Sequence, residues 1–303
     1  MNTDLLTLAA LDASDMNNLF DRAIELKARH NKGINDQPLL GKSVGLVFDK
    51  HSTRTRLSFE VAAIQLGGVP IFISSKDTQM ARNEPIKDTA RVLSRYLDVV
   101  AIRTYSQAFL EEFAEAADIP VINALTDLYH PCQVLSDLLT VIEKKGGYKD
   151  LKIAWLGDGN NMAHSWINAA AALDLTLTLA CPEAYLPDSE IIESAAAKGG
   201  RISVVKDPYE AAKDADVVNT DVWASMGQES EQEKREAVFK DFQVNSELMA
   251  RARSDAIVMH CLPAHRGEEI TEDVLEGPQS VVWDQTENKL HMHKAILDVL
   301  LRH

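Results

Sequence analysis

The stretch FDKHSTRTRLSFE, residues 48–60, decides the fold because it joins two patterns of different kinds. It leaves a β-branched run and enters an apolar helical pattern, so it predicts a strand-to-helix turn. Backbone N–H groups at the start of such a helix have no partner within it. Further donors come from the side chains of Ser52, Thr53, Arg54, Thr55 and Arg56. So many donors at one turn predict an anion site.

The anion expected at this turn is small. The segment is not rich in glycine and does not match the nucleotide-binding pattern G-x-x-x-x-G-K-[ST], which favours a small phosphate-bearing molecule over a nucleotide. The alternative is an ordinary helix cap followed by surface arginines. Arg54 and Arg56 stand two apart, so both cannot share the solvent face with the hydroxyls, and this argues for the anion site.

Apolar runs alternate with helical patterns along the whole chain, which is typical of parallel sheets with crossover helices. The runs expected to be strands lie at about 43–48, 69–73, 98–103, 120–124, 152–156, 175–180, 201–205, 216–219, 256–259 and 280–283. We therefore predict an α/β fold of two doubly wound parallel-sheet domains, with the active site in the cleft between them beyond the carboxyl ends of the strands. The predicted domains are residues 1–146 and residues 147–286, followed by a C-terminal helix at 287–303.

Helical patterns also mark both ends of the chain. Ser14 precedes an amphipathic run and is expected to cap a helix that Gly33 can end. The final pattern from Leu290 is also helical, and His291 and His293, two apart on it, are expected to point apart at the surface.

Four sequence blocks resemble the aspartate/ornithine carbamoyltransferase family. They are STRTR at 52–56, HPCQ at 130–133, DVWASMG at 221–227 and HCLP at 260–263. They span most of the chain in the order found in the family, and the last two resemble its ornithine-using members in particular. The resemblance implies that the first domain binds carbamoyl phosphate, that the second binds ornithine, and that the C-terminal helix 287–303 packs back on the first.

The resemblance also implies roles for individual residues. Carbamoyl phosphate would be bound by Ser52, Thr53, Arg54, Thr55, Gln79, Arg103, His130, Gln133, Cys261, Leu262 and Lys289. Ornithine would be bound by Asn161, Asp221, Ser225 and Met226. The catalytic residues would be Arg103, His130, Asp221 and Cys261. Cys132 is assigned no role and is expected to face the packing.

Taken without the resemblance, several of these residues have simpler interpretations. Arg103 ends a buried-looking strand and could form a structural salt bridge. His130 could be a helix cap, although Gln133 lies one turn on and can face the same ligand. Lys289 stands where the family usually carries an arginine, and it could either reach the ligand as a point charge or face solvent.

The implied reaction transfers the carbamoyl group of carbamoyl phosphate to the δ-amine of L-ornithine, giving L-citrulline and phosphate in arginine biosynthesis. It needs no metal and no organic cofactor. In the family, the loop that carries Gln79 reaches into a neighbouring subunit, so a homotrimer or a multiple of trimers is expected. One alternative is a carbamoyltransferase for another amine acceptor. The other is a nicotinamide-dependent dehydrogenase, suggested by GDGNNM at 157–162, but the third glycine and the ribose-binding acid are missing.

Composition bounds the partners and the compartment. A formal net charge of −15 over 303 residues argues against a nucleic-acid or anionic-membrane partner. The three cysteines form no C-x-x-C pair, which favours a reducing compartment. The N-terminus has no basic targeting region, and no apolar run approaches the ~18 residues of a membrane span. We expect a cytoplasmic protein. His260, Cys261 and His265 lack the spacing of a zinc site.

Overall fold

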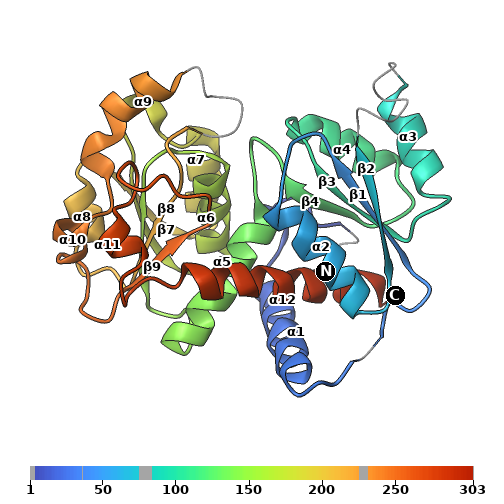
Figure 1. The fold of residues 1–303 in the computed structure, drawn as a ribbon. Coiled ribbons are helices and arrows are strands. Elements are labelled where there is room, and N and C mark those ends of the chain that lie inside the picture. Colours follow the sequence, from blue (N-terminus) through green and yellow to red (C-terminus); the bar gives the residue numbers. More distant parts are fainter. Residues whose placement is uncertain (1–3, 36, 75–83, 225–230, 303) are drawn as a thin grey trace. The chain divides into compact units, whose positions relative to one another are not determined.

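A computed structural model describes residues 4–35, 37–74, 84–224 and 231–302. The chain divides into two compact units (Figure 1). Unit 1 comprises Met1–Leu139 and Glu287–His303, and unit 2 comprises Thr140–Thr286. The divisions fall inside two long helices, α5 (Pro131–Lys145) and α12 (Val282–Leu301).

Unit 1 is built on a parallel sheet of four described strands in the order β2-β1-β3-β4. The strands are β1 (Ser43–Phe48), β2 (Val69–Ser74), β3 (Val99–Arg103) and β4 (Val121–Leu125). The helices of this unit, beside parts of α5 and α12, are η1 (Leu8–Ala10), α1 (Ala13–Asn31), α2 (Arg54–Gln65), α3 (Ile86–Leu93) and α4 (Gln107–Ala116). Strands β1, β3 and β4 are almost entirely buried, as expected for a parallel sheet covered on both faces.

Unit 2 carries a parallel sheet of five described strands in the order β7-β6-β5-β8-β9. The strands are β5 (Lys152–Leu156), β6 (Thr176–Ala180), β7 (Arg201–Val205), β8 (Val217–Thr220) and β9 (Ile257–His260). The helices are α6 (Asn161–Leu173), η4 (Glu183–Tyr185), α7 (Ser189–Ala197), α8 (Pro208–Ala212), α9 (Gln232–Phe239), η6 (Lys240–Phe242), α10 (Ser246–Met249) and α11 (Glu272–Leu275). The predicted α/β fold of two parallel sheets is confirmed.

Each sheet reverses its winding direction at one point, and ligands of doubly wound sheets bind beside such points. In unit 1 the chain runs from β1 outward to β2 and then returns to β3 on the other side of β1. In unit 2 the reversal lies between β5 and β8. Ser52 lies in the turn after β1, Asn161 begins the helix after β5, and Asp221 directly follows β8. The topology thus places these predicted site residues at the switch points of their own sheets.

The predicted elements differ from the structure at both ends of the chain. The first helix is capped by Asp12, whose Oδ1 accepts the Asp15 N–H at 2.9 Å, and not by Ser14, which lies inside the helix. Gly33 follows the helix with a left-handed φ of 69°, as its predicted role requires. The strand expected at 280–283 is wrong, because α12 begins at Val282 and Ser280 forms only an isolated bridge to Val258.

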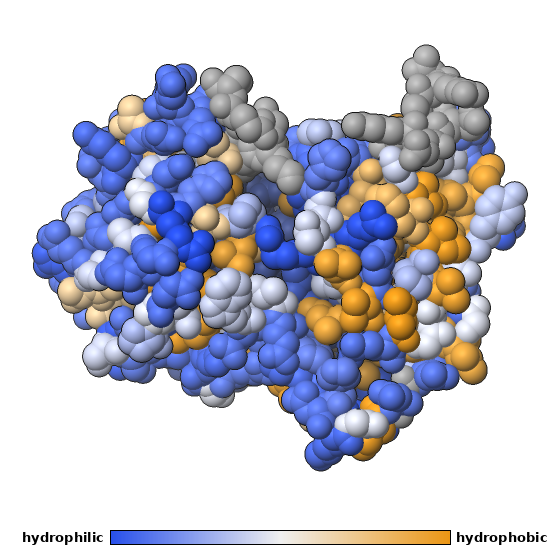
Figure 2. Space-filling view, viewed as in Figure 1, coloured by the Kyte–Doolittle hydropathy of each residue, from blue (hydrophilic) through white to orange (hydrophobic). Residues whose placement is uncertain are grey.

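Strand β2 is the edge of the unit 1 sheet, and it exposes apolar side chains. Val69 is 58% exposed, and Ile71 and Phe72 are also exposed. On the neighbouring helix α2, Leu57 and Ile64 are exposed too. Figure 2 shows hydrophobic side chains gathered on the visible face of unit 1. An exposed apolar edge strand tends to pair with another chain, and patches of this kind mark interaction sites.

Gly159 is required by a close approach of two backbones in unit 2. A Cβ built on it would lie 2.2 Å from the backbone nitrogen of Pro187. We expect Gly159→Ala to lower the free energy of unfolding by about 1–3 kcal/mol, because backbone must shift to admit the methyl group. Chemical denaturation of wild type and variant measures the loss. Gly33→Ala is the comparison, since nothing lies near its Cβ and only its positive φ opposes alanine. An equal loss in both would refute the contact argument.

Candidate active site

The turn after β1 leads into α2, whose first three residues include two arginines. One of the two is already engaged by other side chains. Arg56 donates to Glu60 at 2.8 Å, and its guanidinium lies 3.5 Å from the centre of the Phe72 ring. Thr53 is the N-cap of α2, but its side chain makes no capping hydrogen bond. The half-buried Arg54 has no hydrogen-bond or ion-pair partner among the described residues. The arrangement leaves Arg54, Thr53 and the first-turn N–H groups able to receive an anion.

Behind this turn, unit 1 buries a polar cluster drawn from four elements. Its members are Thr55 at the start of α2, Arg103 at the end of β3, His130 and Gln133 at the start of α5, and Lys289 of α12. The Lys289 ammonium donates to Thr55 Oγ1 at 3.0 Å and to Gln133 Oε1 at 2.8 Å. None of these side chains is more than 7% exposed. Lys289 is therefore part of the cluster, and the solvent-facing interpretation is excluded.

Burial keeps the His130 imidazole neutral. Desolvation holds the pKa of His130 well below its ordinary value, and the nearby charges of Lys289 and Arg103 lower it further. A neutral imidazole can donate one N–H to a carbonyl oxygen, and it carries no additional acidic proton that a nucleophilic amine could take up. His130 thus fits the role of a hydrogen-bond donor better than that of a cationic acid.

Gln133 is oriented from both ends of its amide. Its Oε1 accepts from Lys289, and its Nε2 donates to Asp137 Oδ1 at 2.8 Å. One N–H of the amide and one lone pair of Oε1 stay unassigned by these bonds, so the fixed group can still contact a ligand. Cys132, which lies between His130 and Gln133 in the sequence, is fully buried, and its thiol contacts the Asn123 carbonyl at 3.3 Å. This complete burial confirms the expected packing role, and it raises the pKa of the Cys132 thiol to about 12.

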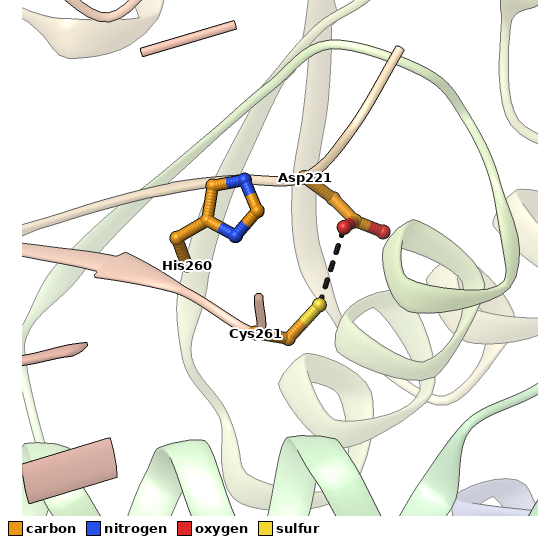
Figure 3. A group of neighbouring side chains, drawn as sticks. All are labelled: Asp221, His260 and Cys261. Carbon is orange, nitrogen blue, oxygen red and sulfur yellow. Dashed lines mark hydrogen bonds between the residues drawn. The ribbon is translucent and has the colours of Figure 1, made fainter. Parts of the chain in front are cut away.

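Unit 2 brings a second polar cluster together around Asp221 (Figure 3). The Cys261 thiol contacts Asp221 Oδ1 at 3.2 Å, and the Asn160 amide donates to Asp221 Oδ2 at 3.1 Å. The carboxylate also accepts its neighbour's N–H, from Val222, at 2.9 Å. Asp221 is 8% exposed. A fixed carboxylate beside a thiol suits a substrate that carries an ammonium group and an amine.

His260 precedes Cys261 at the end of β9, and its hydrogen bonds hold the chain that carries Cys261. Its Nδ1 accepts the Leu262 N–H at 2.9 Å, so its proton sits on Nε2, which contacts Glu269 Oε1 at 2.9 Å. Both side chains are fully buried. Glu269 also accepts the His265 N–H at 2.6 Å. The hydrogen-bonded pair of His260 and Glu269 therefore holds the chain on both sides of residues 261–264. Leu262 itself has a left-handed φ of 59°.

The geometry does not favour a metal at the Asp221, His260 and Cys261 group, although single ligand atoms of the three lie within 4.8 Å of one another. Both ring nitrogens of His260 are already engaged, and a metal would have to displace one of these contacts. His265, Glu268 and Glu269 form a second group of three possible ligands. In this group His265 Nδ1 already contacts Glu268, and Glu269 Oε1 contacts both His260 Nε2 and the His265 N–H.

The glycines after β5 have a packing role, which weakens the dehydrogenase alternative. Gly157 has a positive φ of 128°, and Gly159 lies against Pro187. Asp158 between them forms a buried ion pair with Arg235 at 2.8 Å. Burial raises the pKa of Asp158, and Arg235 opposes that shift. The loop is thus fixed by contacts within unit 2.

Some predicted site residues are placed differently or not at all. Gln79, Ser225 and Met226 lie outside the described residues. Asn161 begins α6, and the side chain that donates to Asp221 is that of the N-cap Asn160, which was not among the predicted site residues. A run of two asparagines before a helix was the available signal, since N-cap asparagine is strongly preferred.

The prediction that His291 and His293 are surface residues is wrong. They are 1% and 0% exposed, because α12 is buried all round from residue 291 to residue 300. The His293 ring stacks on Phe59 with centroids 3.7 Å apart, and its Nδ1 contacts Ser58 Oγ at 2.9 Å. His293 thereby joins α12 to the helix that carries Thr55.

The two buried histidines predict that the fold is less stable in acid. Burial lowers the pKa of both His130 and His293 well below the ordinary 6.5. The unfolded chain therefore binds more protons below about pH 6.5, and stability falls as pH drops through that value. The slope is up to about 1.4 kcal/mol per pH unit for each histidine. We expect His293→Gln to flatten the curve of unfolding free energy between pH 8 and pH 5. Parallel curves for variant and wild type would contradict this.

No helix among the described residues is long and apolar enough to cross a membrane.

Comparison with protein families matches both halves of the chain. Residues 3–143 match the model described as aspartate/ornithine carbamoyltransferase, carbamoyl-P binding domain. Residues 149–300 match the model described as aspartate/ornithine carbamoyltransferase, Asp/Orn binding domain.

Whole-length relatives give the same picture. The chain is 59% identical over 302 residues to an ornithine carbamoyltransferase of Desulfotalea psychrophila, covering 99% of this chain and 100% of the relative. Ornithine carbamoyltransferase from Pyrococcus furiosus superposes with a TM-score of 0.93 at 48% identity, covering 97% of this chain and 95% of the other. The anabolic enzyme of that name from Campylobacter jejuni gives a TM-score of 0.92 at 41% identity and covers 98% of each chain.

Proposed function

The chain belongs to the aspartate/ornithine carbamoyltransferase family, and we propose on that premise that it transfers the carbamoyl group of carbamoyl phosphate to the δ-amine of L-ornithine, giving L-citrulline and phosphate. The observation that carries the proposal is the pair of clusters. Unit 1 gathers donors for a phosphate and a carbonyl oxygen, and unit 2 gathers a carboxylate and a thiol for an amino-acid acceptor. Each cluster thus suits one of the two substrates of the reaction.

In unit 1, Ser52, Thr53, Arg54 and Thr55 hold the phosphate, with Gln79 added from a neighbouring subunit. Arg103, His130 and the Thr55 hydroxyl donate to the carbamoyl oxygen, where negative charge develops as the amine attacks. Because Lys289 donates to Thr55 Oγ1, the hydroxyl proton of Thr55 stays available for that oxygen. Gln133 recognises the carbamoyl amide, and residues 1–146 with 287–303 form this domain.

In unit 2, residues 147–286 hold the acceptor. Asp221 takes the α-ammonium group, Asn161 the carboxylate, and Ser225 and Met226 close over the substrate. Cys261 lies beside the δ-amine, and the Cys261 and Leu262 backbone contacts the carbamoyl group. The amine attacks in its neutral form and its nitrogen bonds to the carbamoyl carbon. The carbon–oxygen bond to phosphate breaks with its electron pair on the phosphate oxygen, and the released phosphate takes up the proton that the nitrogen loses. Asp221 and Cys261 orient the amine for this step.

The decisive assay measures carbamoylated product with ornithine, putrescine, aspartate and acetylornithine as competing acceptors. We expect ornithine to be used at least tenfold better than each of the others, because the acceptor cluster presents a buried carboxylate beside a thiol. Preference for putrescine or acetylornithine would replace this function by that of another carbamoyltransferase.

We propose a homotrimer in the cytoplasm that serves arginine biosynthesis. The exposed apolar edge strand β2 and the exposed Leu57 and Ile64 support an association of copies through unit 1. The cysteines are free thiols, which suits a reducing compartment. The anabolic relative from Campylobacter jejuni supports the biosynthetic direction. The molar mass in solution, measured by light scattering, tests the trimer.

Cys261→Ser separates the two halves of the site. Serine keeps a donor toward Asp221 but shortens its reach, so we expect the Michaelis constant for ornithine to rise about tenfold, equivalent to ~1.4 kcal/mol. Binding of carbamoyl phosphate, followed by calorimetry without ornithine, is expected to change less than threefold. A variant that lost carbamoyl-phosphate affinity and kept its ornithine constant would show that Cys261 acts on the other substrate.

A further inference from the structure

A pocket lies in unit 1, and none of its wall residues is assigned to the reaction. It is formed where the ends of α1 and α2 meet α12, and its walls include Leu26, Arg29, His30, Ile34, Gln65 and Lys294. Its volume is about 260 Å³ with its open mouth included. Much of that space belongs to the open mouth, so only a small group fits among the walls.

Lys294 is the unusual wall residue. The side chain is 3% exposed, yet no described residue accepts a hydrogen bond or forms an ion pair with its ammonium group. Burial alone lowers the pKa of Lys294. Buried lysines are normally paired, because removing an ammonium group from water without a partner is costly. A partner for this lysine is therefore missing among the described residues.

Gln65 adds a second unpartnered group to the same wall. Its Oε1 is buried and has no hydrogen-bond partner among the described residues. The two ends of a carboxamide are interchangeable by a half turn, so the side chain can present its NH₂ to the pocket. A ligand with acceptor oxygens would satisfy both Gln65 and Lys294.

The ionisable wall residues of the pocket are all basic. Arg29 and His30 occupy the last turn of α1, and none of the described wall residues is acidic. The nearby carboxylates are already in ion pairs, since Glu25 contacts Arg22, Glu287 contacts His291, and Asp298 contacts Arg22 and Arg302 through its Oδ2. Asp36, next to the wall residue Asn35 in sequence, lies outside the described residues. In a chain of net charge −15 this is a local concentration of cations.

We propose that this pocket is a second anion site, which binds a phosphate group through Lys294, Arg29 and Gln65. The group is either inorganic phosphate or the phosphate of a small monoester, whose remainder would lie in the open mouth. A phosphate brings more negative charge and more acceptor oxygens than a carboxylate, which matches two cations and an amide at one point. The site does not depend on the proposed reaction.

Calorimetric titration with inorganic phosphate tests the site. Phosphate is also the product of the proposed reaction, so wild type is expected to bind two equivalents per chain. Lys294→Met is expected to lose one of them, with at least tenfold weaker binding, while Lys294→Arg keeps both. Lys32→Met is the matched control: it removes the same charge from an exposed residue just beyond α1 and is expected to keep both.

Arg54→Ala distinguishes this site from the proposed reaction site. Loss of one equivalent in Arg54→Ala and of the other in Lys294→Met supports both assignments. Loss only in Lys294→Met supports the pocket and removes Arg54 from the reaction site. The same phosphate isotherm for wild type and a folded Lys294→Met overturns the proposal. Repeating the titration with glycerol 3-phosphate identifies the source: tighter binding than inorganic phosphate indicates a monoester, and weaker binding indicates free phosphate.

Discussion

Arg103→Met is expected to lower kcat for citrulline formation by about 10²- to 10³-fold, the loss typical of removing one preorganised donor from a developing oxyanion. Arg103 ends β3 at the carboxyl edge of the unit 1 sheet and is 7% exposed. Its charge is close enough to depress the pKa of His130, so the two donors act on one region. Methionine fills a similar volume without the charge.

Two comparisons make the Arg103 result specific. Arg103→Lys restores the charge without the planar fork and is expected to recover part of kcat, because only arginine can hold two oxygens at once. Thermal unfolding of each variant establishes that it is folded. A folded Arg103→Met with kcat within threefold of wild type would show that the guanidinium serves packing only, as the salt-bridge alternative supposed.

The two sheets could be predicted from the sequence because buried parallel strands are short apolar runs separated by helical patterns. Residues 43–48, 152–156 and 201–205 are strands at the predicted bounds. Residues 280–283 could not be assigned this way, since a short apolar run such as residues 281–283 fits both a strand and a segment of a buried helix. Val282 and Trp283 belong to the long helix α12. The packing that fixes this helix is tertiary, so the local sequence does not encode it.

The site could be predicted only where residue type and local order suffice. His130 and Gln133 are one turn apart, so their neighbourhood follows from helix geometry. The bond from Lys289 to Thr55 joins residues 234 positions apart, and no local pattern encodes it. The Asn160 and Asn161 pair shows a finer limit. Which asparagine reaches Asp221 depends on the residue at which α6 begins, and helix ends are poorly fixed by sequence.

Lys289→Ala is expected to raise the Michaelis constant for carbamoyl phosphate by roughly 10- to 150-fold, which corresponds to the ~1.5–3 kcal/mol of a hydrogen bond that involves a charged group. Lys289 is 5% exposed and holds Thr55 and Gln133 by two such bonds. Without it the Thr55 hydroxyl is free to turn away from the substrate, and the Gln133 carbonyl is left buried without that donor.

The remaining question at this position is whether the ammonium group also meets the ligand. Lys289→Met keeps the length of the side chain and removes only the charge, so it separates lost packing from lost donation. Lys289→Arg restores the charge with a fork that can hold two oxygens, and we expect it to match or lower the wild-type Michaelis constant if the group reaches carbamoyl phosphate. If Lys289 acts only by orienting Thr55 and Gln133, the longer arginine disturbs both bonds and the constant rises as in Lys289→Met. Steady-state kinetics on the three variants decide between the two, and equal constants for all three and wild type would remove Lys289 from the active site.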